Sequence, residues 1–388
     1  MLFVSILFAG PLMAQSDLTF EALQSRAKPD PTQLRAEADL ATLQRELATT
    51  GGIFSEGPTI AVEAGRRVTS TGNSTDKAAQ VDAPLLLAPA VRRNARQALE
   101  ASTRTSLALL KAESRQRLRM AYLEAWSTQA QLRVRESQVL ATEAWLRVAQ
   151  ARVASGSDPA FQVDLVMGDQ YRQRAELGEA HRLASEAWAH LRGLADLPLE
   201  PLSLADPGPA VLPDPATQAK AFEQSLMRRV VTERLAREQS HFELQQALRG
   251  ARWSLRGSHA SEGDETVTRF GIALRLPRPG EAKALRSEAS AVRRALDRER
   301  ESTILQLESR FQTALARLRT FGAVPLPLAF EGALAAVDLR FREGKERPSD
   351  ALLLRRQVLE AQIASLQRLR DAHALLAELE VMTLGDPS

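Results

Sequence analysis

Apolar residues recur along most of this chain at the spacing of coiled-coil helices. From Leu118 to Val153 they follow at seven-residue intervals, and from Ile304 to Phe321 they alternate by three and four. Regular spacing over so many residues places the apolar side chains in one narrow seam along each helix. The chain is therefore predicted to consist mainly of long helices that pack through thin seams.

The same spacing sets the expected helix bounds. Two long helices and two return helices are predicted, at about 90–154 and 280–342, and at about 159–196 and 348–383. At ~1.5 Å per residue the first would be roughly 100 Å long, which does not fit an ordinary helix bundle. Gly322, Pro325 and Pro327 predict a kink or short break in the second.

Two segments leave the helical period and alternate between apolar and polar residues. They predict strands at about 59–69 and 78–88, joined by a polar loop, and at about 251–260 and 266–276. Nine residues are expected on the apolar, lipid-facing side: Ile60, Val62, Val81, Leu85, Trp253, Leu255, Phe270, Ile272 and Leu274. Six are expected on the charged, lumen-facing side: Glu63, Asp82, Arg252, Arg256, Arg269 and Arg275.

The strands allow two interpretations. Each has the ~9–11 residues that a tilted strand needs to cross a bilayer. Four strands cannot close a barrel, whereas three copies would supply twelve, an even number that suits an outer-membrane barrel. The alternative is two soluble hairpins that cap a helical bundle.

The chain is built from two copies of one design. A shift of 188 residues superposes Arg152 on Arg340 and Gly156 on Gly344, and it aligns the strand-to-helix junctions. We expect a first repeat at 15–196 and a second at 216–388 that begins with a helix at about 216–250. The linker between them, 197–215, holds six prolines that no helix would accept.

Composition narrows the class of protein. Of the 388 residues, 44% are hydrophobic but only 5% aromatic, and the 51 basic and 48 acidic residues are interspersed, so no nucleic-acid partner is expected. The absence of cysteine excludes disulfides, thiolate metal sites and a lipidated N-terminal cysteine. Residues 1–14 read as a signal peptide without a basic start; a buried N-terminal helix is the alternative.

Nothing in the sequence indicates an enzyme. Phosphate-binding, metalloprotease and nucleophile-elbow motifs are lacking, and the histidines stand apart at positions 181, 190, 241, 259 and 373. We therefore expect neither catalysis nor a metal or other cofactor.

A short motif follows both long helices. It consists of an arginine, a glycine four residues on, an acid, and a leucine-rich helix, and it reads RVASGSDPAFQVDLVMGDQ from Arg152 and RFREGKERPSDALLLRRQ from Arg340. In a duplicated chain that opens with a helix from Asp17 to Leu47, this arrangement resembles the TolC-type outer-membrane efflux channels.

The resemblance implies a homotrimer with a twelve-stranded barrel in the outer membrane and a helical tunnel in the periplasm. A periplasmic adaptor and an inner-membrane pump would engage the tunnel's tips, and substrate would pass through unchanged. Six residues would lie at the tips: Arg152, Gly156, Asp164, Arg340, Gly344 and Asp350. Simple helix capping is the alternative role for these residues.

Departures from the family pattern also carry information. Met167 and Leu353 stand where some members carry a second acid, which argues against an acidic gate. Pro325 and Pro327 look like the pattern of the heavy-metal and cation-efflux branch. A competing hypothesis is a periplasmic coiled-coil structural or adaptor protein that never enters a membrane. That hypothesis does not explain two-faced strand pairs at equivalent points of both repeats.

Overall fold

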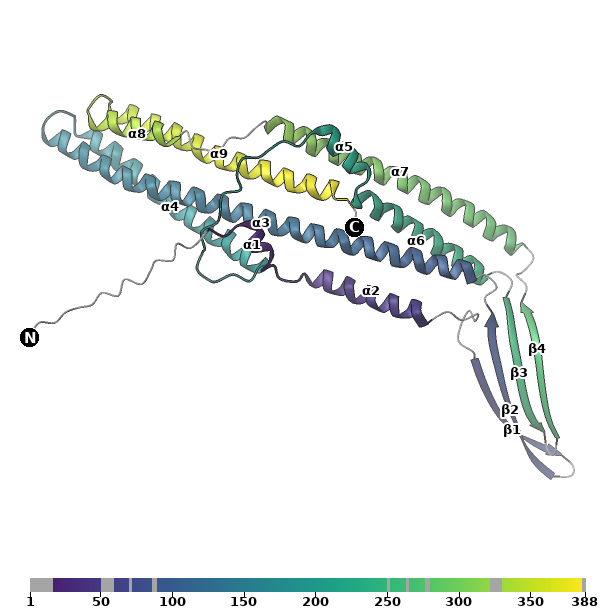
Figure 1. Cartoon of the computed structure of the whole chain (residues 1–388). Helices are drawn as coiled ribbons and strands as arrows, with labels where there is room; N and C mark the ends of the chain where they lie inside the picture. Colours follow the sequence, from purple (N-terminus) through teal and green to yellow (C-terminus); the bar gives the residue numbers. More distant parts are fainter. Residues whose placement is uncertain are drawn as a thin grey trace, which may run out of the picture. The chain divides into compact units, whose positions relative to one another are not determined.

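The protein is mainly α-helical with one small antiparallel sheet, as the sequence predicts (Figure 1). The computed structural model describes residues 17–49, 59–69, 72–85, 89–249, 252–262, 265–275, 280–321 and 330–385. The expected signal peptide lies outside the described residues. So does the predicted break at Gly322, Pro325 and Pro327.

The chain divides into two compact units. We call Met1–Asp30, Ala112–Ala219 and Phe311–Met382 the tip unit, and Pro31–Lys111, Lys220–Arg310 and Thr383–Ser388 the sheet unit. No helix among the described residues is both long and apolar enough to span a membrane.

Two helical hairpins form most of the tip unit (Figure 1). The first consists of α3 (Pro89–Ala154), which enters from the sheet unit, and α4 (Phe161–Leu194). The second consists of α8 (Phe330–Arg342) and α9 (Pro348–Thr383), while the short α1 (Phe20–Gln24) packs beside α3. Their shared core includes the buried side chains of Trp126, Trp188, Leu191 and Leu369.

The proline-rich linker is held on the tip unit by side-chain hydrogen bonds. Prolines lack an N–H group, so the segment forms no helix of its own and its carbonyl groups need other donors. Side chains of α3, α4 and α9 donate to four of these carbonyl groups: Trp188 to Leu199 O (3.2 Å), Gln129 to Leu202 O (3.1 Å), Tyr122 to Ala205 O (2.7 Å) and His373 to Gly208 O (3.0 Å). Trp126 donates to the carboxylate of Asp206 (2.7 Å). Burial raises the pKa of the Tyr122 hydroxyl, which keeps it protonated as a donor.

The sheet joins the two repeats. Its order is β1 (Thr59–Thr69), β2 (Gly72–Leu85), β3 (Arg252–Glu262) and β4 (Glu265–Arg275), and every neighbouring pair is antiparallel. The expected polar loop before residue 78 is wrong in part. Residues 72–77 are strand and pair with residues 64–69 of β1.

The remaining helices belong to the sheet unit wholly or in part. They are α2 (Pro31–Thr49), α5 (Pro215–Glu223), α6 (Leu226–Arg249) and α7 (Glu281–Phe321). The single helix predicted at 216–250 is instead two helices, because Gln224 and Ser225 are not helical. There the Ser225 hydroxyl accepts the backbone N–H of Arg228 at 3.4 Å, which caps the start of α6.

Candidate functional site

The turn between α3 and α4 explains the spacing of the arginine and glycine in the tip motif. Gly156 has φ +75°, and its N–H bonds to Val153 O at 3.0 Å. The N–H of Ser157 bonds to Arg152 O at 2.9 Å. These two bonds form a Schellman motif, in which the residue after the helix takes the left-handed conformation that glycine adopts without strain.

The turn between α8 and α9 has the same geometry. Gly344 has φ +71°, its N–H bonds to Phe341 O at 3.1 Å, and Lys345 N–H bonds to Arg340 O at 3.0 Å. In both tips the arginine carbonyl accepts the hydrogen bond that spans five residues, from the residue after the glycine. The four-residue spacing is thus a consequence of how the helix ends.

The tip arginines pair with acids that the sequence analysis did not single out. Arg152 Nη2 donates to Asp158 Oδ1 at 3.1 Å while its Nε lies 2.9 Å from Oδ2, and Arg340 Nη2 lies 2.6 Å from Glu346 Oε1. The 188-residue shift also superposes residue 158 on residue 346, a correspondence that could have identified both acids.

The expected tip acids lie elsewhere. Asp164 and Asp350 are exposed in the first turns of α4 and α9, where a carboxylate is favoured by the helix dipole. Within the chain they are not the partners of Arg152 and Arg340. The Asp350 carboxylate instead accepts a hydrogen bond from the hydroxyl of Ser349 at 3.3 Å.

An aromatic stack joins the two hairpins below the tips. The fully buried rings of Trp145 on α3 and Phe341 on α8 stack with centroids 4.1 Å apart and planes inclined by 17°. The guanidinium carbon of Arg355 on α9 lies 5.0 Å from the Trp145 ring, and that of Arg152 lies 5.8 Å from the Phe341 ring. Two stacked rings, each with an arginine beside it, therefore connect the two hairpins.

Polar contacts complete this joint. Trp145 Nε1 donates to Asp338 Oδ1 at 3.0 Å, and Arg355 Nη2 donates to Gln138 O at 3.3 Å. Burial lowers the pKa of the Arg355 guanidinium, and the carboxylate of Asp338, 3.9 Å away, acts in the opposite direction. Sequence periodicity placed Trp145 on a helix but gave no partner for it.

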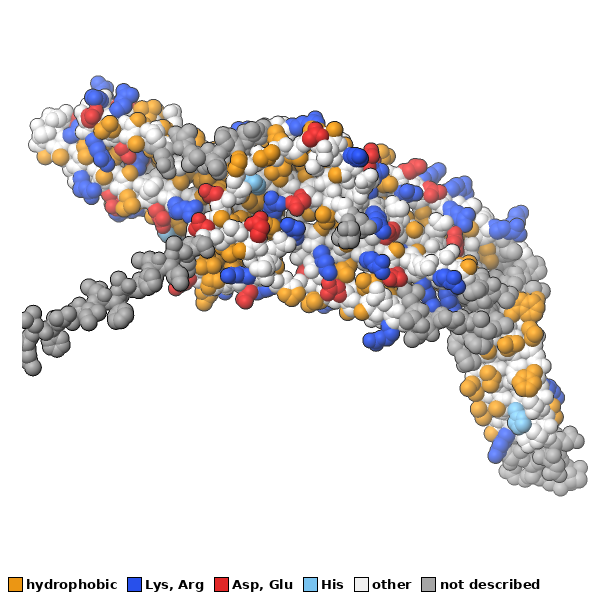
Figure 2. Space-filling view, in the orientation of Figure 1, with side chains coloured by type: hydrophobic (Ala, Val, Ile, Leu, Met, Phe, Trp, Pro, Cys, Tyr) orange, Lys and Arg blue, Asp and Glu red, His pale blue; other side chains and the backbone are white. Residues whose placement is uncertain are grey.

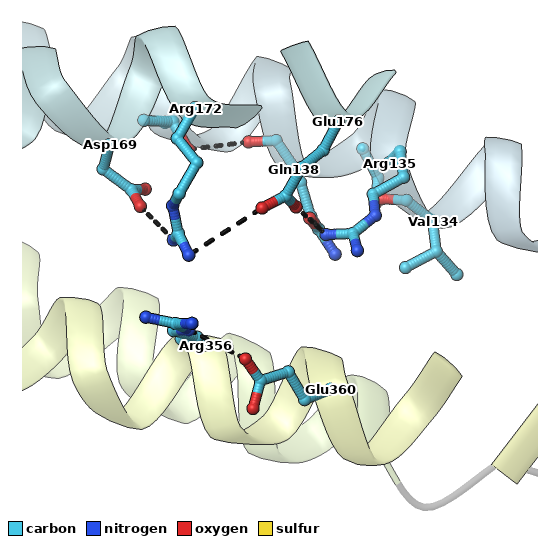
Figure 3. A network of polar contacts seen from close by, with 10 residues as sticks. Val134, Arg135, Gln138, Asp169, Arg172, Glu176, Arg356 and Glu360 are labelled. Carbon is cyan, nitrogen blue, oxygen red and sulfur yellow. Dashed lines mark hydrogen bonds and ion pairs between the residues drawn. The ribbon is translucent and has the colours of Figure 1, made fainter. Parts of the chain in front are cut away.

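Ion pairs run along the first hairpin near this joint (Figure 3). Arg172 on α4 contacts Asp169 and Glu176 on the same helix, and Glu176 in turn pairs with Arg135 on α3. Arg135 Nη1 also donates to Gln138 Oε1 at 3.1 Å. Of these ion pairs, the one between Arg135 and Glu176 joins α3 to α4.

The strand register divides the sheet into two different faces. All nine residues expected on the apolar side share one face, since Ile60 pairs with Val81, Leu85 with Trp253, and Leu255 with Ile272. Val62 is 75% and Phe270 87% exposed. Figure 2 shows hydrophobic side chains gathered over the described part of the sheet. Such a continuous exposed apolar surface needs a partner or a lipid environment.

The six charged positions share the other face. Thr59 pairs with Asp82, which pairs with Arg256, and Arg252 pairs with Arg275. Arg256 Nε lies 3.1 Å from Asp82 Oδ2. Among the described residues β1 and β4 each pair on one side only, so both edges of the sheet carry unpaired backbone groups.

The described histidines and acids show no metal-binding arrangement. Within the part of the chain that the structure describes, no three His, Asp or Glu side chains come together as possible metal ligands. His259 Nδ1 contacts Thr268 Oγ1 at 2.8 Å, and His373 is buried against the linker.

Comparison with solved structures identifies the fold as that of the TolC-type outer-membrane efflux channels. The outer-membrane channel OprN superposes with a TM-score of 0.72 at 15% identity, over 95% of this chain and 90% of that one. CusC gives 0.78 at 13% identity, over 96% and 93%, and VceC from Vibrio cholerae gives 0.73 at 15%, over 94% and 96%.

The likeness is one of structure. No model of a known family matches the sequence, and no curated protein matches it. The superposition on these solved structures confirms the fold resemblance drawn from the duplicated tip motif, although the sequence identities are low.

Proposed function

We propose that this chain is the outer-membrane channel of a tripartite efflux system. Three copies would join their sheets edge to edge into a twelve-stranded barrel, and their helices would form a tunnel in the periplasm. The observation that carries the proposal is the sheet, with one exposed apolar face, one charged face and two edges that pair with no other strand among the residues described.

Each of these features suits a barrel of several copies. The unpaired backbone groups of β1 and β4 would bond to neighbouring copies, because exposed strand edges are costly in lipid. The face with Val62 and Phe270 would contact lipid, and the face with Asp82 and Arg256 would line water.

The helical hairpins would carry the contacts with partners. In this proposal a periplasmic adaptor and an inner-membrane pump engage the tips, where Arg152, Gly156, Asp164, Arg340, Gly344 and Asp350 lie. Substrate passes through without a reaction, so its identity is set mainly by the pump. A heavy-metal or other cation substrate is supported by Pro325 and Pro327 alone.

Fractionation tests the proposal. The protein should sediment with outer membranes and migrate in gels as a heat-modifiable oligomer. Recovery only from the soluble periplasmic extract would overturn the channel and favour the coiled-coil structural or adaptor protein.

A pair of neighbouring substitutions tests the two faces. Ile272→Arg places a charge on the apolar face and should abolish membrane assembly, since an arginine in mid-bilayer is strongly destabilising. Ala273→Arg is the matched control on the charged face and should assemble. Equal assembly of the two variants would contradict the assignment of the faces.

A further inference from the structure

A groove crosses the apolar face of the sheet along β2, β3 and β4. It has a volume of about 720 Å³ and a mostly apolar lining, and it lies among the hydrophobic side chains that Figure 2 shows over the sheet. Ala79 and Gly257 leave it open, while Phe270, 87% exposed, borders it. The Phe270 ring lies 3.5 Å from the position that a Cβ would take at Gly257. A glycine inside a strand often marks a place where a ligand approaches the backbone closely.

The groove ends in polar side chains. His259 and Thr268 pair across β3 and β4, and His259 Nδ1 lies 2.8 Å from Thr268 Oγ1. Two residues further toward the hairpin turns, about 7 Å along each strand, Lys77 pairs with Ser261 and Ser261 with Thr266. Side chains two residues apart share a face of a sheet, so these five lie on the same face as the groove.

The chemistry of this polar end suits a phosphate. Lys77, His259 and Thr266 are exposed, and none of the strand positions described on this face is an acid. With Nδ1 accepting the Thr268 hydroxyl, His259 can donate through Nε2. An ammonium group, an imidazole N–H and neighbouring hydroxyls are donors that an anionic oxygen accepts, and the bond from the ammonium group is the strongest kind.

Other copies of the chain would not cover the groove. Copies joined edge to edge would meet at β1 and β4, whereas the groove opens on the face of the sheet. In a barrel that face meets lipid. An apolar groove with a cation beyond one end matches a lipid, whose acyl chain is apolar and whose headgroup carries a phosphate.

We propose that the groove binds an acyl chain of a phosphorylated glycolipid in the outer leaflet, with a headgroup phosphate at Lys77. The inference rests on the proposed function. With the helices in the periplasm, the strand ends that adjoin α3, α6 and α7 face inward, and Lys77 lies toward the outward end. Phosphorylated glycolipids are the main lipids of that leaflet. The methylene stem of a lysine tolerates apolar surroundings, and its charge attracts anionic headgroups.

Native mass spectrometry of the full-length oligomer in detergent, mixed with lipid A, tests whether the groove is the site. The wild type should bind lipid A. Ala79→Leu fills the groove with an apolar side chain, so the oligomer should still assemble but lose most of the bound lipid A. Val62→Phe is the control, since Val62 pairs with Ala79 on the same face but does not line the groove. It should bind lipid A like the wild type.

A second set of variants tests the phosphate. Lys77→Gln should weaken lipid A binding about fivefold, as expected for one cation at a membrane surface, and Lys77→Arg should keep it. Lys283→Gln removes an exposed charge on α7 and should have no effect. Lipid A without phosphate should bind the wild type as weakly as lipid A binds Lys77→Gln.

Three results would overturn the inference. In the first, Ala79→Leu and Lys77→Gln bind lipid A like the wild type, or a control loses as much as they do. In the second, phosphatidylglycerol binds as tightly as lipid A and loses as much in both variants, which would indicate a phospholipid in the groove. In the third, inorganic phosphate alone binds with the same dependence on Lys77, which would indicate a site for soluble anions.

Failure of the two proposals is distinguishable. If the chain is recovered only from the soluble periplasmic extract, the channel itself is refuted. If the oligomer is recovered from outer membranes but binds lipid A equally in the wild type, Ala79→Leu and Lys77→Gln, only the lipid inference fails. The same spectra report the mass of the oligomer, so each variant is compared in its assembled form.

Discussion

The indole ring of Trp145 lies flat on the phenyl ring of Phe341, with centroids 4.1 Å apart, and the two residues come from different helical hairpins. Both side chains are fully buried, in a small cluster with Ala149, Val166 and Ala351 that is separate from the larger core around Trp126. The stack is therefore a local joint between the hairpins close to their tips.

Removing the indole tests how much this joint contributes. Trp145→Ala should lower the free energy of opening the tip hairpins by about 3–5 kcal/mol, because it leaves a cavity between two helices. Hydrogen exchange of the α8 amides would measure the loss. Trp145→Phe is the control: it keeps a ring against Phe341 but loses the hydrogen bond to Asp338, and it should lose clearly less. Equal losses would mean that the stack contributes little.

A second prediction concerns the buried guanidinium of Arg355. Arg355→Met should destabilise the joint by about 3 kcal/mol or less, because it leaves the Asp338 carboxylate without its cation in a partly buried site. Adding Asp338→Asn should recover part of the loss, since a neutral amide oxygen still accepts the Trp145 N–H. Additive losses in the double variant, measured by the same exchange, would show that the two side chains do not interact.

The tip glycines should be sensitive to substitution although they have space for a side chain. Beyond the two neighbouring residues in the chain, no heavy atom lies within 4 Å of a Cβ added at Gly156, and at Gly344 the nearest is Arg152 Cζ at 4.0 Å. Alanine at either position should still cost roughly 1–2 kcal/mol, because φ is positive at both.

Helical Gly178 provides the control for these glycines. It also has nothing within 4 Å of an added Cβ, but its φ is not positive, so Gly178→Ala should stabilise α4 by about 0.5–1 kcal/mol. Thermal unfolding of the three variants would compare them directly. Stabilisation by Gly156→Ala would contradict the role of the Schellman turn.

Part of this structure is readable from the sequence for a physical reason. The seven-residue period through Leu118 and Val153 reports which side of a helix is buried, and that is enough to predict a long helix there. The two-residue alternation around Val81 and Leu255 likewise fixes which side chains share a face of the sheet.

Other features depend on contacts that periodicity does not encode. Residues 72–77 have no apolar alternation, and they are strand through their pairing with β1 and, at Lys77, also with β3. Trp145 and Phe341 meet because two hairpins pack together, and a helical period identifies a buried face without identifying the helix that covers it. The pairing of Arg152 with Asp158 follows from the shape of the turn.

Two acids of the first tip, Asp158 and Asp164, differ in their contacts. Asp158 holds the Arg152 guanidinium through two contacts, and their side chains are 12% and 20% exposed. Asp158→Asn should weaken the turn by about 1 kcal/mol, as expected for a partly buried ion pair. Asp164→Asn should have a smaller effect on the turn, because Asp164 is exposed in the first turn of α4. The reverse order in thermal unfolding would show that Asp164 is the structural acid.

His373 links the stability of the tip unit to pH. Its ring is buried against Gly208 O, and burial, together with the charge of Arg119, lowers its pKa below the usual value of about 6.5. Between the lowered pKa and about 6.5 the unfolded chain binds more protons than the folded one, so stability rises with pH across that window and falls on acidification. His373→Gln can still donate to Gly208 O but does not titrate, so it should remove this part of the pH dependence of thermal unfolding. His181→Gln, at an exposed position on α4, should leave the dependence unchanged. If His373→Gln keeps the full slope below about pH 6.5, another group is responsible for it.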